Sequence, residues 1–271
     1  MDPQTRAALF LARTPLHSLL RWGHRKLDRY IDLAENWNNG DETLNGEAFL
    51  IRSVAAHLSV VLDIGANVGN WSAALIEQNP KCRVFAFEPS PATHATLKKR
   101  AEGRAQWRVF QAGMGDQEGV LSFCDYGDNS VLSSFVSREA SIGLQPQRRL
   151  EAPVTTVDAF LAREKLDLVD FVKIDTEGYE MKVLRGMKQA LKSHRIGLIQ
   201  FEYGGTWLDA GETLSKANDW FKDHHYQLFR LYPDHVSPVE YDCRKHECFK
   251  YSNFLAARSS SILSDWGVPV R

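Results

Sequence analysis

The chain has only four cysteines among its 271 residues, and they are scattered between Cys82 and Cys248. So few and so dispersed thiols exclude a disulfide framework and fit a reducing compartment, so we expect a cytoplasmic protein. The sequence also lacks an uncharged run of about 18 apolar residues, the length that a membrane-spanning helix needs. The apolar run near the N-terminus stops at Arg13 and is shorter than the core of a signal peptide. We therefore expect a soluble protein without stable membrane insertion.

An excess of positive charge is also missing. The 33 Lys and Arg residues are balanced by 34 Asp and Glu residues, which gives a formal net charge of −1. A protein that binds nucleic acid usually carries a basic face, because the phosphate backbone dominates the affinity. A nucleic-acid partner is therefore disfavoured, and a homodimer is left open. The hydrophobic content of 44% allows one sizeable core.

From residue 60 onward, short β-branched or aromatic runs alternate with helical patterns, which is typical of a mostly parallel sheet covered by helices. The predicted strands span residues 60–64, 83–88, 107–113, 169–175, 196–202, 226–232 and 251–258. The predicted helices span about 70–78, 91–101, 179–194 and 212–224. The last two strands have no helix between them, so they should pair antiparallel. The sequence predicts an α/β, doubly wound, Rossmann-like sheet of seven strands, the last one antiparallel.

Three regions are expected along the chain: an N-terminal helical extension at residues 1–45, a main domain at 46–258 and a C-terminal tail at 259–271. Within the extension, one helical face is apolar and the other carries arginine and lysine. The pattern favours a helix packed on the domain with a solvated basic side, and a membrane-surface or partner-binding helix is the alternative. The apolar face consists of Leu16, Leu19, Leu20, Leu27, Tyr30 and Ile31, and the basic face of Arg21, Arg25, Lys26 and Arg29.

The stretch VLDIGANVGNWS, residues 61–72, forms the first strand-to-helix turn. A dinucleotide fold would need G-x-G-x-x-G there, but Asn67 and Asn70 stand where glycines are required. The sequence has no G-x-x-x-x-G-K-[ST] motif either, which argues against a nucleoside triphosphate. The turn is therefore built for a ligand that lacks a pyrophosphate.

The turn offers an acid at the strand end, Asp63, and two glycines, Gly65 and Gly69, that let the backbone approach a ligand with an amine and a carboxylate. The second strand ends in Glu88, where a carboxylate can accept both hydroxyls of a ribose. An amino acid joined to a nucleoside without a diphosphate describes S-adenosylmethionine, and we expect this cofactor.

Several blocks of the chain, in order, resemble the FkbM-type family of S-adenosylmethionine-dependent methyltransferases. The blocks are VLDIGANVGNWS, VFAFEPSP, AGMGDQEGVLSF, PVTTVDAFL, VDFVKIDTEGYEMKVLRGM and YSNFLAAR. The FEPSP and KIDTEGYE segments are the most specific of them, and the resemblance covers roughly residues 45–257. It implies a class I methyltransferase sheet and O-methylation of a hydroxyl on a sugar, glycolipid or natural product. The implied partner is thus a small-molecule or glycan acceptor.

Carried over by position, the resemblance places the methionine end of the cofactor at the glycine turn, the ribose at Glu88 and the adenine edge at residues 114–116. The NGE segment at residues 45–47 also matches a family feature. The cofactor-binding residues expected from motif and resemblance together are Glu47, Asp63, Gly65, Asn67, Gly69, Glu88, Pro89, Gly113, Met114, Gly115, Asp116 and Asp175.

A hydroxyl acceptor needs a general base, and carboxylates follow the fourth and fifth predicted strands. Asp175, Glu177 and Glu202 are the candidates, with Lys173 as an ion-pair partner. Asp175 is favoured, whereas Glu177 also fits a first-turn acid that opposes a helix dipole. We expect no metal site, although three acids could also hold a divalent cation. An N-methyltransferase and a non-catalytic cofactor-binding module are the alternatives.

Two further segments bear on ligands. CRKHEC places Cys243, His246 and Cys248 close together, but a single C-x₄-C without a second pair favours an ordinary loop over a zinc site. Acceptor specificity in such folds resides in loops and added segments. We expect it in residues 1–45, 125–150 and 205–211, with Arg138 available for an anionic group.

Overall fold

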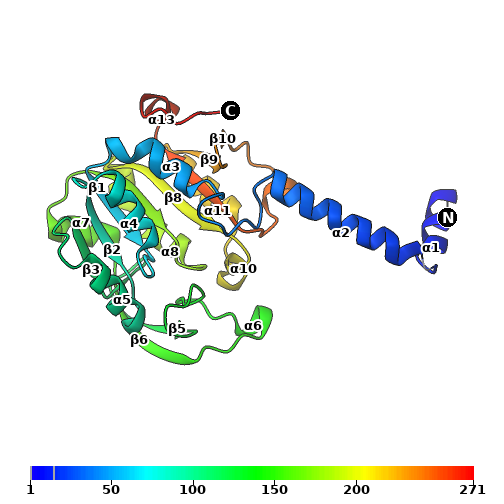
Figure 1. The fold of residues 1–271 in the computed structure, drawn as a ribbon, viewed down its shortest axis with the longest axis horizontal. Coiled ribbons are helices and arrows are strands. Elements are labelled where there is room, and N and C mark those ends of the chain that lie inside the picture. Colours follow the sequence, from blue (N-terminus) through cyan, green and yellow to red (C-terminus); the bar gives the residue numbers. More distant parts are fainter. Residues whose placement is uncertain (1, 15) are drawn as a thin grey trace. The chain divides into compact units, whose positions relative to one another are not determined.

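The computed structural model describes residues 2–14 and 16–271. It forms two compact units, one ending at Asn39 and the other spanning Gly40–Arg271 (Figure 1). The first unit contains the helices α1 (Pro3–Leu11) and α2 (Leu16–Ala34). The α1 helix begins at Asp2, whose side chain accepts a hydrogen bond from the amide of Thr5, so a free amide of the first turn is capped.

The second unit, described from residue 40 to residue 271, is built on an eight-stranded sheet with the order β10-β9-β11-β8-β7-β1-β2-β3. Five neighbouring strands, from β8 to β3, run parallel, and β11 runs antiparallel to both β8 and β9. The strands are β1 (Val60–Ile64), β2 (Arg83–Phe87), β3 (Trp107–Phe110), β7 (Val169–Ile174), β8 (Ile196–Tyr203), β9 (Gln227–Leu231), β10 (Val236–Pro238) and β11 (Ser252–Ala257). The prediction of a Rossmann-like class I sheet with a reversed last strand is confirmed.

The eighth strand, β10, was not predicted. The chain turns back directly after β9, where the amide of Tyr232 donates to the carbonyl of His235 at 2.9 Å. This turn places Val236 opposite Leu231 in an antiparallel pair. A strand of three residues has no periodicity that a sequence could reveal.

Helices flank the sheet (Figure 1). Those of the second unit are α3 (Glu47–Val54), η1 (Ala55–His57), α4 (Asn70–Gln78), α5 (Pro91–Ala101), α6 (Glu139–Ile142), α7 (Val157–Glu164), α8 (Glu180–Arg185), α9 (Lys188–Lys192), α10 (Thr206–Ala210), α11 (Leu214–Asp223), α12 (Cys243–His246) and α13 (Ser260–Asp265). The predicted helix at 179–194 is wrong as a single helix, because α8 and α9 are separated at Gly186. A Cβ atom at Gly186 would lie 1.9 Å from the carbonyl oxygen of Gly115, so the chain needs glycine at this close approach.

The region between β3 and β7 forms a second, three-stranded sheet with the order β4-β6-β5. Its strands are β4 (Gly113–Met114), β5 (Gly119–Asp125) and β6 (Arg148–Thr155). A long loop and α6 connect β5 to β6. At the other end of the chain, α13 buries Leu263 against the core of the main sheet.

Candidate functional site

A cleft lies at the carboxyl ends of the central strands, where β1 leads to β2 on one side and adjoins β7 on the other. Open α/β sheets bind their ligands at such a reversal of strand order. The turns after β1, β2 and β7 line the cleft together with the end of β8. Of the predicted site residues, the lining includes Glu47, Gly65, Asn67, Glu88, Pro89, Gly113, Met114, Lys173, Asp175, Glu177 and Glu202.

The glycine turn after β1 is held tightly between two neighbouring strands. Gly65 has a φ of +81°, and its amide donates to the carbonyl of Phe87 at 3.0 Å. A Cβ atom on Gly65 would lie 1.8 Å from the carbonyl oxygen of Asp175. Both the left-handed backbone and this close approach require glycine. The turn thereby brings the ends of β1 and β7 together at the floor of the cleft.

Glu88 follows β2 and its carboxylate is fixed by backbone amides. One oxygen accepts from the amide of Ser90 at 2.9 Å, and the other from the amide of Asn67 at 3.0 Å. Burial raises the pKa of Glu88 to about 7, although these two hydrogen bonds oppose the shift. The side chain thus has a fixed position in the cleft and titrates near neutral pH.

In the described part of the chain, four of the predicted cofactor-binding residues do not line the cleft. They are Asp63, Gly69, Gly115 and Asp116. A Cβ atom on Gly69 would meet Leu97 and Trp107, so this glycine serves the packing of the α4 N-terminus. Asp116 forms an ion pair with Lys182 of α8 at 2.8 Å.

Asp63 is fully buried beneath the floor of the cleft. Its carboxylate accepts a hydrogen bond from the Ser72 hydroxyl of α4 at 2.5 Å. Burial raises the pKa of Asp63, and the nearby Lys173 opposes the shift. Asp63 therefore links the end of β1 to α4 through Ser72 and provides a negative charge near Lys173.

Lys173 is the central cation of the site and is only 6% exposed. Its ammonium group donates to Asp175 at 2.8 Å. Burial alone would lower the pKa of Lys173, but the surrounding acids Asp175, Glu47 and Asp63 hold it well above its ordinary value. Lys173 therefore stays charged at neutral pH.

Glu47 of α3 is one of the acids around Lys173, and a residue of the distant strand β8 holds its carboxylate in place. Its carboxylate accepts from the side-chain amide of Gln200 at 2.7 Å and from that of Asn45 at 3.1 Å. The sequence predicted Glu47 but missed Gln200, which is buried in β8 and gives no motif signal. The NGE segment is thus tied to the end of the central sheet.

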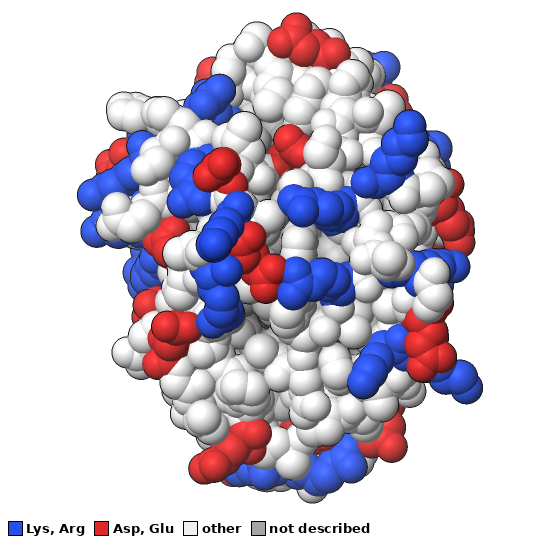
Figure 2. Space-filling view, turned by 90° about the vertical axis from the view of Figure 1, so that its left-hand side faces the viewer, with Lys and Arg blue, Asp and Glu red and all other residues white. Residues whose placement is uncertain are grey.

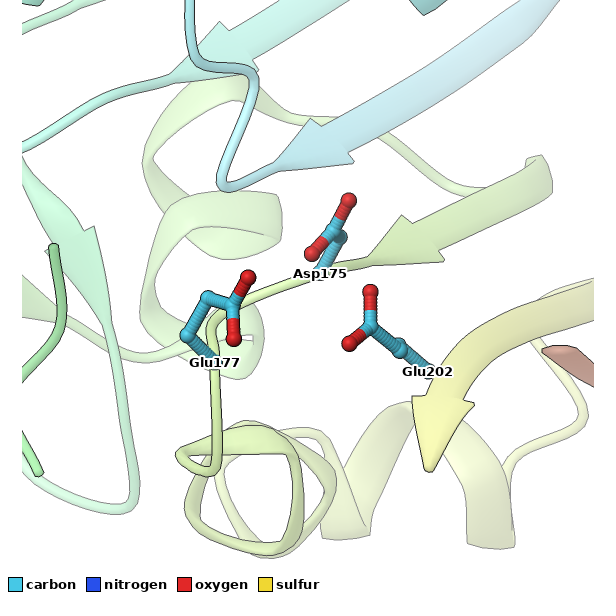
Figure 3. Close-up of side chains that lie close together, drawn as sticks. All are labelled: Asp175, Glu177 and Glu202. Carbon is cyan, nitrogen blue, oxygen red and sulfur yellow. The ribbon is translucent and has the colours of Figure 1, made fainter. Parts of the chain in front are cut away.

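Asp175, Glu177 and Glu202 point toward one another at the ends of β7 and β8 (Figure 3). One carboxylate oxygen from each lies within 4.8 Å of the others. Burial raises the pKa of Glu202 well above its ordinary value, and the neighbouring charges of Asp175 and Glu177 raise it further. Glu202 also shares a side-chain hydrogen bond with Asp175. Burial and the close spacing of the carboxylates thus disfavour the charged forms of Glu177 and Glu202.

Glu177 pairs with Arg138, a residue from the loop between β5 and β6. Burial and the neighbouring charge of Asp175 raise the pKa of Glu177 to about 8, although Arg138 opposes the shift. The hydroxyl of Ser134 anchors the same loop by donating to the carbonyls of Thr176 and Glu177, each at 2.9 Å. Arg138 therefore reaches the carboxylate cluster, as a counter-ion to Glu177.

A second hollow adjoins the cleft on the far side of the carboxylates. Glu177, Glu202 and Tyr251 line both. The rest of the second hollow is polar near Thr206 and apolar near Leu208. Tyr251 precedes β11 and was not predicted as a site residue. The carboxylate cluster thus stands between two spaces, one at the glycine turn and one between α6 and α10.

The CRKHEC segment is organised by Glu247. The Glu247 carboxylate accepts from the amides of Leu214 and Ser215, and from the hydroxyls of Tyr203 and Tyr241. Cys243 is exposed on α12. These bonds tie the segment to the N-terminus of α11, as expected of a structural loop.

The sequence model of the methyltransferase FkbM domain matches residues 63–228. The chain belongs to the FkbM methyltransferase family. The matched region runs from β1 into β9 and contains the glycine turn, Glu88 and the carboxylate cluster. The predicted family and the predicted methyltransferase activity are thereby confirmed.

Three relatives illustrate the range of the family. This FkbM-family methyltransferase is 29% identical over 188 residues to the hexuronic acid methyltransferase AglP of Haloferax volcanii. The aligned region covers 68% of this chain and 73% of AglP. It is 26% identical to the 2-O-methyltransferase NoeI of Sinorhizobium fredii, over 58% of this chain and 68% of the relative. It is 28% identical to the 31-O-demethyl-FK506 methyltransferase FkbM of Streptomyces tacrolimicus, over 48% of this chain and 60% of the relative.

Among solved structures, the precorrin-6y C5,15-methyltransferase of Geobacter metallireducens is 13% identical in sequence to this chain. Its TM-score is 0.42, and the comparison covers 78% of this chain and 87% of that chain.

Basic and acidic side chains are interspersed on the face of the FkbM-family chain that Figure 2 shows. Within residues 2–14 and 16–271, no helix has the length and hydropathy that crossing a bilayer requires.

Proposed function

We propose that this FkbM-family enzyme transfers the methyl group of S-adenosylmethionine to a hydroxyl group of a sugar, glycolipid or natural product. The observation that carries the proposal is the carboxylate cluster between the glycine-turn cleft and the second hollow. Two relatives whose names specify O-methylation, NoeI and FkbM, support a hydroxyl acceptor, and AglP, whose name specifies a hexuronic acid, supports a sugar-containing acceptor.

The cleft residues fit the proposed cofactor. Glu88 presents a carboxylate, held by two amides, that suits the two hydroxyls of a ribose. Gly65 and Asn67 have positive φ angles and line the cleft, which suits close backbone contact with the methionine part. Met114 and Gly113 offer an apolar surface for the adenine. When bound, the cofactor supplies an activated methyl group on a sulfonium.

The residues of the chain would then position the acceptor and remove its proton. A hydroxyl entering from the second hollow meets Glu202 and Glu177 first, and Asp175 lies directly behind them. We propose that the hydrogen-bonded pair of Asp175 and Glu202 accepts the hydroxyl proton, while Lys173 fixes Asp175. Glu177 and Arg138 border the acceptor space, where Arg138 provides a positive charge for an anionic group.

Incubation with methyl-labelled S-adenosylmethionine and matched alcohol, amine and carboxylate acceptors, followed by mass spectrometry, tests this function. We expect label on the hydroxyl of a sugar-containing acceptor. Label found only on amines would favour the N-methyltransferase alternative, since a neutral amine needs no base in the transition state. Cofactor binding without transfer to any acceptor class would favour a non-catalytic module.

The pH profile of turnover should move to lower pH when Glu177 is replaced by Gln. The base must be unprotonated, so activity is lost as the pH falls through the pKa of the pair. Glu177 exchanges protons in the same pH range as this pair, and its charged form raises the pKa of Glu202, so Gln, which carries no charge, lowers it. Glu77→Gln, which removes a charge from an exposed position of α4, is the matched control and should leave the profile unchanged. Measurement of kcat from acidic to basic pH decides, and an acidic limb that stays in place or moves upward contradicts the assignment.

A further inference from the structure

The α2 helix carries a long apolar face that no other part of its own unit covers. None of the described residues of α2 is buried. Six apolar side chains recur at helical spacing on one side, and each is between 44% and 69% exposed. They are Leu16, Leu19, Leu20, Leu27, Tyr30 and Ile31. A helix of this length gains most of its stability from covering such a face, so the face requires an occupant.

The opposite side of α2 is mainly basic, and Asp28 and Asp32 lie among its arginines. Arg21, Arg25 and Arg29 succeed one another at intervals of four residues, which places them on one side of the helix. Lys26 lies at the border of the apolar face, with its ammonium group 5.8 Å from the centre of the Trp22 ring. Six Lys and Arg residues but three Asp and Glu residues occur among residues 1–34, whereas the whole chain has 33 and 34. Residues 1–34 thus carry an excess of positive charge, whereas the charges of the whole chain nearly cancel.

We propose that α2 lies on the surface of a lipid bilayer that contains anionic lipids. An apolar face flanked by arginine and lysine is the pattern of helices that lie in the plane of a membrane interface. Trp22 and Tyr30 are both exposed and combine an apolar ring with a polar atom, which suits the headgroup level. The basic side chains would then meet the negative headgroups.

Two other occupants explain less of the pattern. If the apolar face packed against another protein surface, including a second copy of the chain, the leucines would be buried. Such packing would give no role to the arginines on the far side. A bilayer accounts for both faces at once, because the apolar face enters the acyl boundary and the polar face stays in water.

Vesicle flotation of the purified full chain tests the proposal. We expect binding to vesicles of phosphatidylcholine mixed with phosphatidylglycerol, and much weaker binding to pure phosphatidylcholine. The double variant Leu20→Glu/Leu27→Glu and the double variant Arg21→Glu/Arg25→Glu should each lose binding to the mixed vesicles by more than about tenfold. Val120→Glu, an equivalent change at an exposed position of β5, is the matched control and should bind as the unmodified chain does.

Circular dichroism and thermal unfolding of each variant show whether the fold is retained, independently of any methyl transfer. Equal binding of all variants to the mixed vesicles would overturn the proposal. So would a monomeric chain that binds neither vesicle type, since the face would then be covered within its own chain. A dimer that Leu27→Glu dissociates, without vesicle binding, would overturn it in favour of self-association.

Discussion

Replacing Asp175 by Asn is expected to lower kcat by at least about 10²-fold, while the Kd for S-adenosylhomocysteine changes far less. The substitution keeps the shape of the side chain but removes the charge that pairs with Lys173 and that, in the proposed mechanism, accepts the hydroxyl proton. Glu202→Gln should have a similar effect, because Gln cannot take up a proton at the same site. Stopped-assay kinetics with labelled cofactor, together with calorimetry of product binding, separate the two quantities.

Asp167→Asn removes an exposed carboxylate just before β7 and is the matched control. It should leave both kcat and Kd unchanged. Addition of a chelator should also leave activity intact. If a chelator abolishes turnover and Mg²⁺ restores it, then Asp175, Glu177 and Glu202 are metal ligands and the base assignment is wrong.

Much of the fold could be predicted because local patterns and tertiary structure agree. The alternation of strands and helices from residue 60 specified the parallel sheet, and α4 and α5 begin and end at the predicted residues. Gly65 could be identified because its geometry serves one turn, and Glu88 because it follows a strand that ends at the cleft. Such features depend on residues close together in the sequence.

Contacts between distant segments could not be predicted. Arg138 and Glu177 are 39 residues apart, and Gln200 and Glu47 are 153 residues apart. The loop that carries Arg138 has no helical or strand periodicity, so its position on the end of β7 depends on Ser134 and the carbonyls that this side chain binds. Asp63 was predicted to bind the cofactor because it is an acid at a strand end. Its complete burial, which places it outside the cleft lining, could not be predicted from the sequence.

The affinity for S-adenosylhomocysteine should depend on the protonation of Glu88. The ribose hydroxyls are donors, so they favour the carboxylate form of this side chain. Burial raises the pKa of Glu88 to about 7, so its charged form is lost as the pH falls below neutral. Binding should therefore release a proton, and the affinity should fall by up to about tenfold for each pH unit well below 7. Calorimetry in buffers of different ionisation enthalpy measures this proton release.

Glu88→Ala is then expected to weaken S-adenosylhomocysteine binding at pH 8 by about 2–4 kcal/mol, roughly 30- to 1,000-fold in Kd. The loss of affinity comes from the missing bonds to the ribose, whereas the unpaired amides of Asn67 and Ser90 lower the stability of the turn. Glu88→Gln keeps an oxygen that accepts from one of these two amides, so it should remain folded, bind weakly and lose the pH dependence. Glu102→Ala, at an exposed position after α5, should bind as the unmodified chain does. If Glu88→Gln binds S-adenosylhomocysteine tightly with the original pH dependence, another group holds the ribose, and tight binding of NAD instead would refute the cofactor itself.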